Sequence, residues 1–286
     1  MPDREIKKKL DDKRILVTGG QGFLGRHLCA RLKELCKEVY LYDNDVRRIN
    51  GFFKRYDIVC HLAGVTKAES DMEARLLFDV NVNGVLSVMR YCQEKSSRCI
   101  FASSSAVYRT TASDKPLIET SLREPATLYG LSKAMGEDIC RYHALNYGVS
   151  TTAFRIFNMY GPGQKEPFLI PYVINRLSKN KPIILKAPAA VRDFIYVTDV
   201  VTAFIFSCAH EHSGFKVLNL GTGKGISVRE MAERVALRMG IKSRVEKHNS
   251  RNIKKDLAIA DIKNMLKYAH FRPKISIDEG LMLLFR

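Results

Sequence analysis

The feature that most constrains this chain is a glycine-rich turn that joins a short apolar strand, residues 15–17, to an amphipathic helix that begins near Gly22. The glycines follow a G-x-x-G-x-x-G spacing, and Gly20, Gly22 and Gly25 also satisfy the G-x-G-x-x-G pattern of dinucleotide-binding turns. One glycine permits the tight turn, one lets the backbone approach a pyrophosphate, and one lets the helix pack closely on the strand. The diphosphate then binds the unpaired N–H groups at the helix N-terminus. The stretch therefore predicts a Rossmann-type nucleotide site.

An acidic residue follows at the distance that such a site requires. Asp43 closes the next apolar run, residues 39–42, roughly 20 residues after the turn, where a carboxylate can hold a ribose 2′-hydroxyl. The same carboxylate would repel a 2′-phosphate, so Asp43 favours NAD over NADP. Arg47 and Arg48 lie close enough in the sequence to keep NADP open as an alternative.

The cysteines and the distribution of apolar residues indicate the cellular setting. The seven cysteines are dispersed and no pair has the spacing of a metal site, which is typical of reduced thiols in a cytoplasmic protein without a structural metal. No apolar run approaches the length that spans a bilayer, and the charged N-terminus lacks the apolar segment of a signal peptide. We therefore expect a cytoplasmic protein with no membrane span.

The formal net charge of +17 is high for 286 residues. It can attract anionic substrates, a membrane surface or nucleic acid, or it can be spread over solvated helix faces. The sequence has no dense basic block with interleaved aromatic residues, so a nucleic-acid partner is not favoured.

Strands and helices alternate through the first half of the chain, which predicts a parallel sheet in an α/β fold. Further elements are expected as strands at 57–63, 98–104 and 150–157 and as helices at 71–94 and 126–147. Only 13 residues separate Asp43 from Asp57, which is too few for a full βαβ unit. One strand should therefore be missing or vestigial there, with residues 49–53 forming at most a short helix.

The pattern of alternation changes after Gly161, Pro162 and Gly163. We expect a Rossmann-type doubly wound parallel sheet, with one strand region shortened, and a small C-terminal substrate-binding lobe. The predicted division gives the NAD-binding core residues 1–160, with 190–225 returning to it, and gives the lobe residues 161–189 and 226–286.

The motif Tyr129-x-x-x-Lys133 carries the predicted chemistry. Positions i and i+4 share one face of a helix, and an ammonium beside a phenol lowers the pKa of the phenol from about 10. A tyrosine tuned in this way can take a proton from a sugar hydroxyl while hydride leaves the same carbon. The preceding strand ends in Ser103, Ser104 and Ser105, and a serine at the carboxyl edge of a sheet can orient the reacting oxygen.

Together these motifs resemble the extended short-chain dehydrogenases/reductases that act on nucleotide sugars, the NAD-dependent epimerase/dehydratase family. The resemblance covers nearly the whole chain. The stretches that carry it are 18–25, 57–63, 81–83, 103–105, Tyr129-x-x-x-Lys133, 155–163, 192–199, 219–223 and 260–261.

The resemblance implies roles for particular residues. Ser104 corresponds to the catalytic serine or threonine of the family, Tyr129 to its acid/base, and Lys133 to the lysine that tunes the tyrosine and binds the nicotinamide ribose. The residues implied to bind the cofactor are Gly19, Gly22, Phe23, Leu24, Gly25, Asp43, Leu62, Ala63, Asn81, Tyr129 and Lys133. The residues implied to bind the sugar nucleotide are Ser105, Asn158, Arg192 and Arg251.

Several positions depart from the family pattern. Dehydratases of the family carry an Asp-Glu pair where this chain has Ser105 and Ala106, so dehydration is disfavoured. The short segment after Asp43 removes the acidic stretch that usually borders adenine. Residues 186–190 and 252–254 also differ from the family where the sugar nucleotide is held, so the sequence leaves the sugar open.

We expect a nucleotide-sugar 4-epimerase that uses bound NAD, with a UDP-sugar as the favoured substrate. The alternative is an NAD(P)H-dependent reductase of 4-keto nucleotide sugars that uses the same three catalytic residues. A non-catalytic dinucleotide- or RNA-binding protein of the same fold is a third alternative, which the net charge suggests and the intact Ser104, Tyr129 and Lys133 oppose. The helices at 71–94 and 126–147 match those that form a four-helix dimer interface in the family, so the resemblance implies a homodimer.

Overall fold

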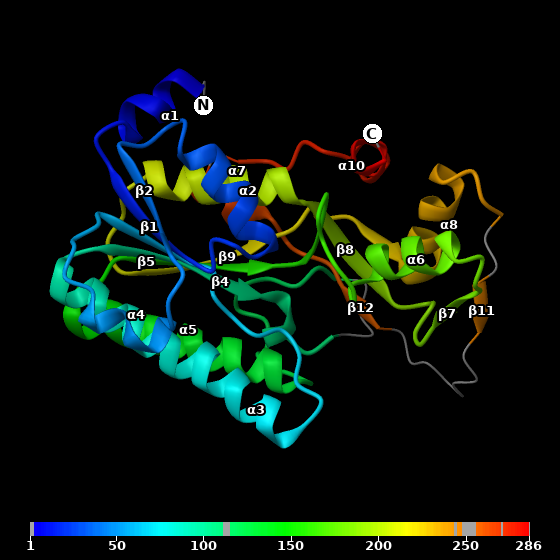
Figure 1. Cartoon of the computed structure of the whole chain (residues 1–286), viewed down its shortest axis with the longest axis horizontal. Helices are drawn as coiled ribbons and strands as arrows, with labels where there is room; N and C mark the ends of the chain where they lie inside the picture. Colours follow the sequence, from blue (N-terminus) through cyan, green and yellow to red (C-terminus); the bar gives the residue numbers. More distant parts are fainter. Residues whose placement is uncertain (1–2, 111–114, 243–244, 248–255, 270, 286) are drawn as a thin grey trace.

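The computed structural model of the chain describes residues 3–110, 115–242, 245–247, 256–269 and 271–285. A six-stranded sheet runs through its larger part (Figure 1). In spatial order its strands are β2 (Glu38–Tyr42), β1 (Arg14–Thr18), β3 (Ile58–His61), β4 (Arg98–Ser104), β5 (Thr151–Ile156) and β9 (Phe215–Leu220). All neighbouring strands are parallel, which confirms the predicted α/β fold.

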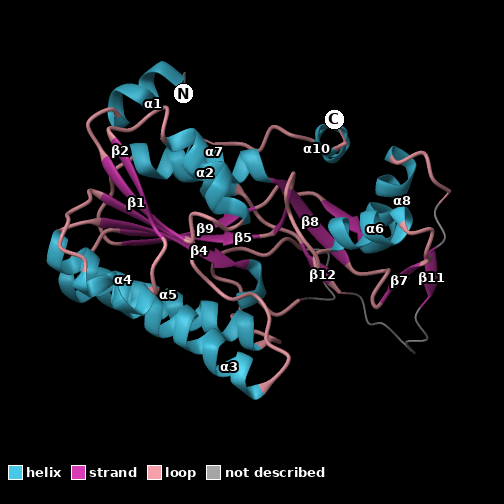
Figure 2. Cartoon of the chain, viewed as in Figure 1, coloured by secondary structure: helices cyan, strands magenta, loops and turns pink. Residues whose placement is uncertain are grey.

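Helices cover both faces of this sheet, as Figure 2 shows. One face carries α1 (Asp3–Leu10), α2 (Phe23–Leu32) and α7 (Val197–Ala209). The other face carries α3 (Asp71–Phe78), α4 (Gly84–Lys95) and α5 (Leu128–Tyr147). The central strands β1 and β3 are therefore buried on both sides, which explains why their sequences read as continuous apolar runs.

The helix predicted at 71–94 is confirmed, although it is not regular throughout. It begins with a capping box, in which the Ser70 hydroxyl accepts from the Glu73 N–H and the Glu73 carboxylate accepts from the Ser70 N–H. A π-helical turn, η2 (Asp79–Asn83), joins α3 to α4. Such turns widen a helix locally and are frequent at functional sites.

β2 forms one edge of the sheet, because β3 pairs with the opposite side of β1. Between β2 and β3 the chain makes a 3₁₀-helix, η1 (Val46–Gly51), and no described strand lies beyond β2. The shortened strand region is thus confirmed. Aromatic packing occupies this side instead: Phe52 stacks on Tyr40 with 5.1 Å between ring centroids, and Tyr56 packs against both rings.

The rest of the chain forms a smaller mixed region, which adjoins the sheet where β6 (Asn158–Tyr160) continues from β5 (Figure 1). Its central strand is β8 (Val191–Tyr196), which pairs with β6, β10 (Gly225–Ser227) and β12 (Leu257–Ala258). A separate pair is formed by β7 (Ile183–Leu185) and β11 (Val245–Lys247). The helices here are α6 (Leu169–Ser178), α8 (Val228–Arg238) and α10 (Ile277–Leu284), whereas α9 (Lys263–Ala269) packs against β9 and α7.

The smaller C-terminal region is confirmed, but the domain boundaries drawn from the sequence remain a prediction. β8 lies in the second sheet, whereas α7 and β9, which follow it, belong to the layers of the main sheet. Within the described residues, no helix is both long and apolar enough to cross a membrane. All seven cysteines are described; each is a free thiol, and six are buried.

Candidate active site

The glycine turn has the close geometry that its spacing predicts. Gly19 has φ of +69°, a left-handed conformation that favours glycine, and a Cβ there would lie 2.6 Å from the Ala63 amide nitrogen. Gly22 is the N-cap of α2, and its N–H donates to the Gly19 carbonyl at 3.0 Å. A Cβ on Gly25 would lie 2.2 Å from the same carbonyl oxygen. Only glycine therefore lets α2 pack this closely on the turn.

A cleft of about 340 Å³ opens beside this turn. Phe23 and Leu24 begin α2 next to Gly22, and Leu62 precedes Ala63 after β3. The residues that line the cleft are Gly19, Gln21, Gly22, Tyr42, Asp43, Asn44, Asp45, Val46, Ala63 and Val80. The lining combines a glycine turn, two aspartates and two valines, which fits the phosphate, ribose and adenine of a dinucleotide.

Val46 and Val80 supply apolar surface in the part of the cleft where the sequence does not show what would border adenine. They supply an apolar wall where the short segment after Asp43 removes the usual adenine border. Both come from irregular helices, Val46 from η1 and Val80 from η2.

Arg47, which follows the cleft residues Asp45 and Val46, is already paired. Arg47 donates to both carboxylate oxygens of Asp45, at 2.9 Å and 2.7 Å, and reaches Asp79 at 3.4 Å. The hydrogen bond with Arg47 lowers the pKa of Asp45 to about 2, so the pair is charged at neutral pH. Arg47 is therefore already held by carboxylates of the protein, beside the cleft that Asp43 also lines.

Asn81, predicted to lie near the cofactor, fixes the segment after β3. Its side chain accepts from the Val65 N–H at 2.8 Å and donates to the Val65 carbonyl at 2.8 Å. It also donates to the Ser132 hydroxyl of α5 at 2.9 Å. Asn81 lies in the π-turn η2. This irregular turn therefore places the buried Asn81 side-chain amide between α5 and the segment that follows β3.

Ser104, Tyr129 and Lys133 come together at the carboxyl end of β4. Ser104 ends this strand and caps a 3₁₀-turn, η3 (Ser105–Val107). Tyr129 and Lys133 lie in the first turns of α5, where a Cβ on Gly130 would be 2.2 Å from the Ala106 carbonyl oxygen. This close approach of α5 to η3 brings the Ser104 hydroxyl near the Tyr129 phenol, where it acts on the pKa of the phenol.

The electrostatics of this trio differ in part from the sequence-based expectation. Burial raises the pKa of Tyr129, and the nearby Ser104 hydroxyl offsets this in part. Burial also lowers the pKa of Lys133 to about 8. The Lys133 ammonium donates to the Ala102 carbonyl at 2.8 Å and lies 5.9 Å from the centroid of the Tyr129 ring. The lowering of the phenol pKa by lysine is therefore not seen in the protein alone.

The residues predicted to bind the sugar nucleotide are only partly brought together. Ser105 opens η3 beside Ser104, and Asn158 begins β6 just past β5. Arg192, on β8, donates to the Asp256 carboxylate at 2.7 Å and to the Asp256 carbonyl at 3.0 Å. Arg251 lies outside the described residues.

Sequence reasoning missed three polar groups that support the site. Thr18 and His61 are fully buried side by side, with 2.7 Å between the Thr18 hydroxyl and His61 Nδ1, and Thr18 also accepts from the Ala63 N–H. Both residues stand in stretches that carry the family resemblance, 18–25 and 57–63, where a polar residue inside a buried strand is the available signal. Asp256, the partner of Arg192, gave no such signal because the two residues are far apart in the sequence.

Comparisons with known proteins agree with this geometry. The NAD dependent epimerase/dehydratase family matches residues 15–221. A UDP-glucuronate 4-epimerase of Thermodesulfobacterium geofontis is 29% identical over 88% of this chain and 80% of its own length. A dTDP-4-dehydro-6-deoxyglucose reductase of Escherichia coli is 26% identical over 95% and 96%. The structure of the Thermotoga maritima UDP-glucose 4-epimerase with UDP-glucose is similar with a TM-score of 0.86 at 25% identity, covering 95% of this chain and 97% of that one.

Proposed function

Because the chain belongs to the NAD-dependent epimerase/dehydratase family of enzymes, we propose that it is a nucleotide-sugar 4-epimerase that keeps its NAD bound. Family membership confirms the resemblance and the enzymatic prediction drawn from the sequence. The observation that carries the finer proposal is the assembly of Ser104, Tyr129 and Lys133 at the end of β4, close to the glycine-lined cleft.

In the proposed reaction the protein moves one proton and orients one hydroxyl. Tyr129 would take the proton of the sugar C4 hydroxyl, and the Ser104 hydroxyl, which lies near the phenol, would donate a hydrogen bond to the same oxygen. Bound NAD would supply the hydride chemistry at C4, both the removal of hydride and its return to the other face of the 4-keto sugar, and Gly19, Gly22 and Asp43 would help to hold it. Lys133, with its pKa near 8, would hold the nicotinamide ribose and supply positive charge beside the phenol. Tyr129 gives its proton back, so the reaction is redox-neutral.

The proposed substrate is a UDP-sugar. The T. maritima relative was solved with UDP-glucose, and the T. geofontis relative is named for UDP-glucuronate. Ser105 and Asn158 would contact the sugar nucleotide, and Arg192 and Arg251 would bind its diphosphate. Dehydration remains disfavoured, because Ser105 and Ala106 carry no acid that could protonate a leaving hydroxyl.

Two measurements on the purified protein test this function. Heat denaturation followed by mass spectrometry should release NAD in a one-to-one ratio with the chain. Incubation with UDP-glucose, UDP-glucuronate and UDP-N-acetylglucosamine, followed by NMR, should then reveal the 4-epimer of at least one sugar without added cofactor. Failure of all three sugars to epimerise, with NAD present in the protein, would exclude this substrate class.

The second candidate is a reductase of 4-keto nucleotide sugars, which the similarity to the E. coli reductase favours. It would use the same three residues but consume reduced cofactor in every cycle. Steady oxidation of NADPH or NADH with a 4-keto sugar, together with weakly held and exchangeable cofactor, would support this activity over epimerisation.

The cofactor preference should depend on Asp43. We expect Asp43→Asn to narrow the preference for NAD over NADP by about tenfold, because it removes the charge that repels a 2′-phosphate. Both affinities are measured by titrating the protein with NADH and with NADPH and following the fluorescence, to which no tryptophan contributes. Asp11→Asn, at an exposed position far from the cleft, is the control and should leave the ratio unchanged. An unchanged ratio in Asp43→Asn would remove Asp43 from the ribose site.

We also propose a homodimer, formed by the face of α3 and α5 that carries exposed apolar side chains. Along α5 these side chains are three or four residues apart, except for the step of seven residues from Met135 to Tyr142. Two more lie on α3. They are Met72, Leu76, Leu128, Leu131, Met135, Tyr142 and Leu145.

The free cysteine thiols support the cytoplasm as the proposed location of the protein.

Introducing charge into this face should separate the dimer. The double variant Leu131→Glu with Leu145→Glu places two carboxylates where the second copy would pack, so we expect monomers at micromolar concentration. Light scattering coupled to size exclusion measures the mass. Leu237→Glu, at a leucine that is 76% exposed on α8, is the matched control and should remain dimeric. A wild-type protein that is already monomeric would contradict the proposal.

A further inference from the structure

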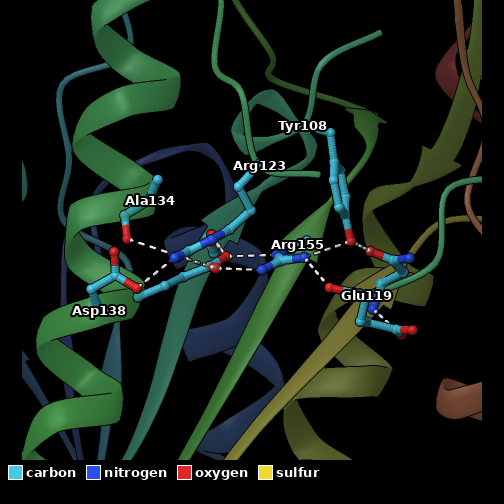
Figure 3. Close-up of polar contacts among 9 residues, drawn as sticks. Tyr108, Glu119, Arg123, Ala134, Asp138 and Arg155 are labelled. Carbon is cyan, nitrogen blue, oxygen red and sulfur yellow. Dashed lines mark hydrogen bonds and ion pairs between the residues drawn. The ribbon is translucent and has the colours of Figure 1, made fainter. Parts of the chain in front are cut away.

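A buried ion pair lies below the catalytic trio and takes no part in the proposed reaction. Glu137, on α5, is 1% exposed and Arg155, on β5, is 4% exposed. The Arg155 guanidinium donates to both carboxylate oxygens of Glu137, at 2.9 Å and 2.6 Å. Figure 3 shows Arg155 at the centre of the surrounding network, with Arg123 on one side and Tyr108 on the other.

The position of Glu137 connects it to the catalytic residues on two elements. On α5 it follows Tyr129 and Lys133 at four-residue intervals, so all three lie along one face of the helix. The Glu137 carboxylate also accepts from the hydroxyl of Ser103, on β4, at 2.5 Å, and Ser103 directly precedes Ser104. Glu137 thus joins the helix that carries Tyr129 to the strand that carries Ser104.

Arg155 extends the network to the segment that follows the catalytic turn. It donates to the Tyr108 hydroxyl at 2.8 Å and to the Glu119 carbonyl at 2.8 Å. Tyr108 in turn donates to Asn219, on β9, at 2.6 Å. The turn η3 is therefore held at its far end, through Tyr108, by the same arginine that holds Glu137.

A buried pair of this kind is weak evidence for stability. The cost of removing two charges from water can exceed their attraction, and apolar replacements of similar volume are often equally stable. What the network does provide is a fixed distance between β4, α5 and β5, because each polar group has a partner of defined geometry. We propose that Glu137 is a positioning residue of the reaction, which holds the end of β4 against α5 and so sets where Ser104 lies relative to Tyr129 and Lys133.

Glu137 also acts on the charge of Lys133. The titratable groups that face Lys133 are Tyr129, Glu137 and Cys140 on α5 and His61 on β3. Burial lowers the pKa of Lys133, and the nearby Glu137 carboxylate raises it. Removing that carboxylate should therefore make Lys133 lose its proton at lower pH.

The test uses Glu137→Gln, which keeps the shape of the side chain and removes its charge. Because the inference rests on the proposed function, the readout is hydride transfer, the step that an epimerase and a reductase share, followed by the near-ultraviolet absorbance of the reduced nicotinamide. We expect the rate to fall by about ten- to a hundredfold while the affinity for NADH changes less than about threefold. The alkaline limb of the rate against pH should move to lower pH.

Three further variants separate positioning from folding. Asp199→Asn weakens another buried carboxylate, which accepts from the Lys274 and Ile275 N–H groups, and should leave the rate unchanged. Ser103→Ala removes only the link to β4 and should give a smaller fall of the rate. If Glu137→Gln does not fold, Glu137→Leu with Arg155→Met removes both charges together and should fold but remain slow.

The proposal is overturned if folded Glu137→Gln, or the folded double variant, transfers hydride at the wild-type rate. Carbon-13 NMR of the lysine side chains, with Lys133→Met for assignment, gives a second readout that needs no substrate. Lys133 should titrate near pH 8 in the wild type and at lower pH in Glu137→Gln. If the wild-type enzyme transfers no hydride to or from any sugar, the proposed function fails, and an unchanged titration of Lys133 then overturns this inference as well.

Discussion

Replacing Tyr129 with phenylalanine is expected to lower kcat for epimerisation by about 10²–10⁴-fold, because the variant keeps the ring but loses the group that takes the C4 proton. The phenol is the proposed acid/base of the trio, and the nearby Ser104 hydroxyl, which lowers its pKa, is the proposed partner at the reacting oxygen. The affinity for NADH should change little, since the cleft that would hold adenosine is lined by other residues. Initial rates with the true sugar nucleotide, together with cofactor titration, measure both effects.

A matched control for this variant is available on α9. Tyr268→Phe removes the hydroxyl of a tyrosine that is 47% exposed and far from the trio in the sequence, and it should keep full activity. Wild-type turnover by Tyr129→Phe would show that another group accepts the proton and would sink the proposed mechanism.

The second large effect is expected from Gly25→Ala. A Cβ at this position would lie 2.2 Å from the Gly19 carbonyl oxygen and 2.7 Å from the Gly20 backbone. Both contacts are with backbone atoms of the glycine turn, which cannot move aside as a side chain can. The helix α2 must therefore move away from the turn. We expect a loss of about 1–3 kcal/mol in the free energy of unfolding and at least about tenfold weaker NAD binding, because the N–H groups at the start of α2 lose their alignment.

Chemical denaturation and cofactor titration measure the two effects of Gly25→Ala. Gly51→Ala is the control, because a Cβ at Gly51 would meet no atom within 4 Å, and both quantities should stay near wild type. An alanine at position 25 that binds NAD normally would show that the close packing of α2 on the turn is not needed for the cofactor.

Local signals in the sequence predict those parts of the site that are built from short spacings. The glycine turn and the Tyr129-x-x-x-Lys133 pair are each determined by a few consecutive residues. In the structure both lie at the carboxyl end of the parallel strands. The count of residues between Asp43 and Asp57 also predicts the missing strand, since a crossover needs a minimum length.

Contacts between distant segments could not be predicted in this way. The partners Glu137 and Arg155 lie on different elements, and either alone reads as an ordinary charged residue on a helix or strand. The pairing of Arg192 with Asp256 depends on how β12 adds to β8. The pKa of Tyr129 follows from burial of the phenol, which spacing alone does not reveal.

The open edge at β2 has a consequence for how the cofactor and the protein stabilise one another. Among the described strands β2 is an edge strand, with a row of backbone N–H groups that no neighbouring strand accepts from, so we expect its amides to exchange with solvent more readily than those of β1 or β3. Asp43 follows β2 directly, and the cleft includes Tyr42. A dinucleotide held in this cleft would bind only the ordered form of this edge, and by mass action it would suppress local opening of β2.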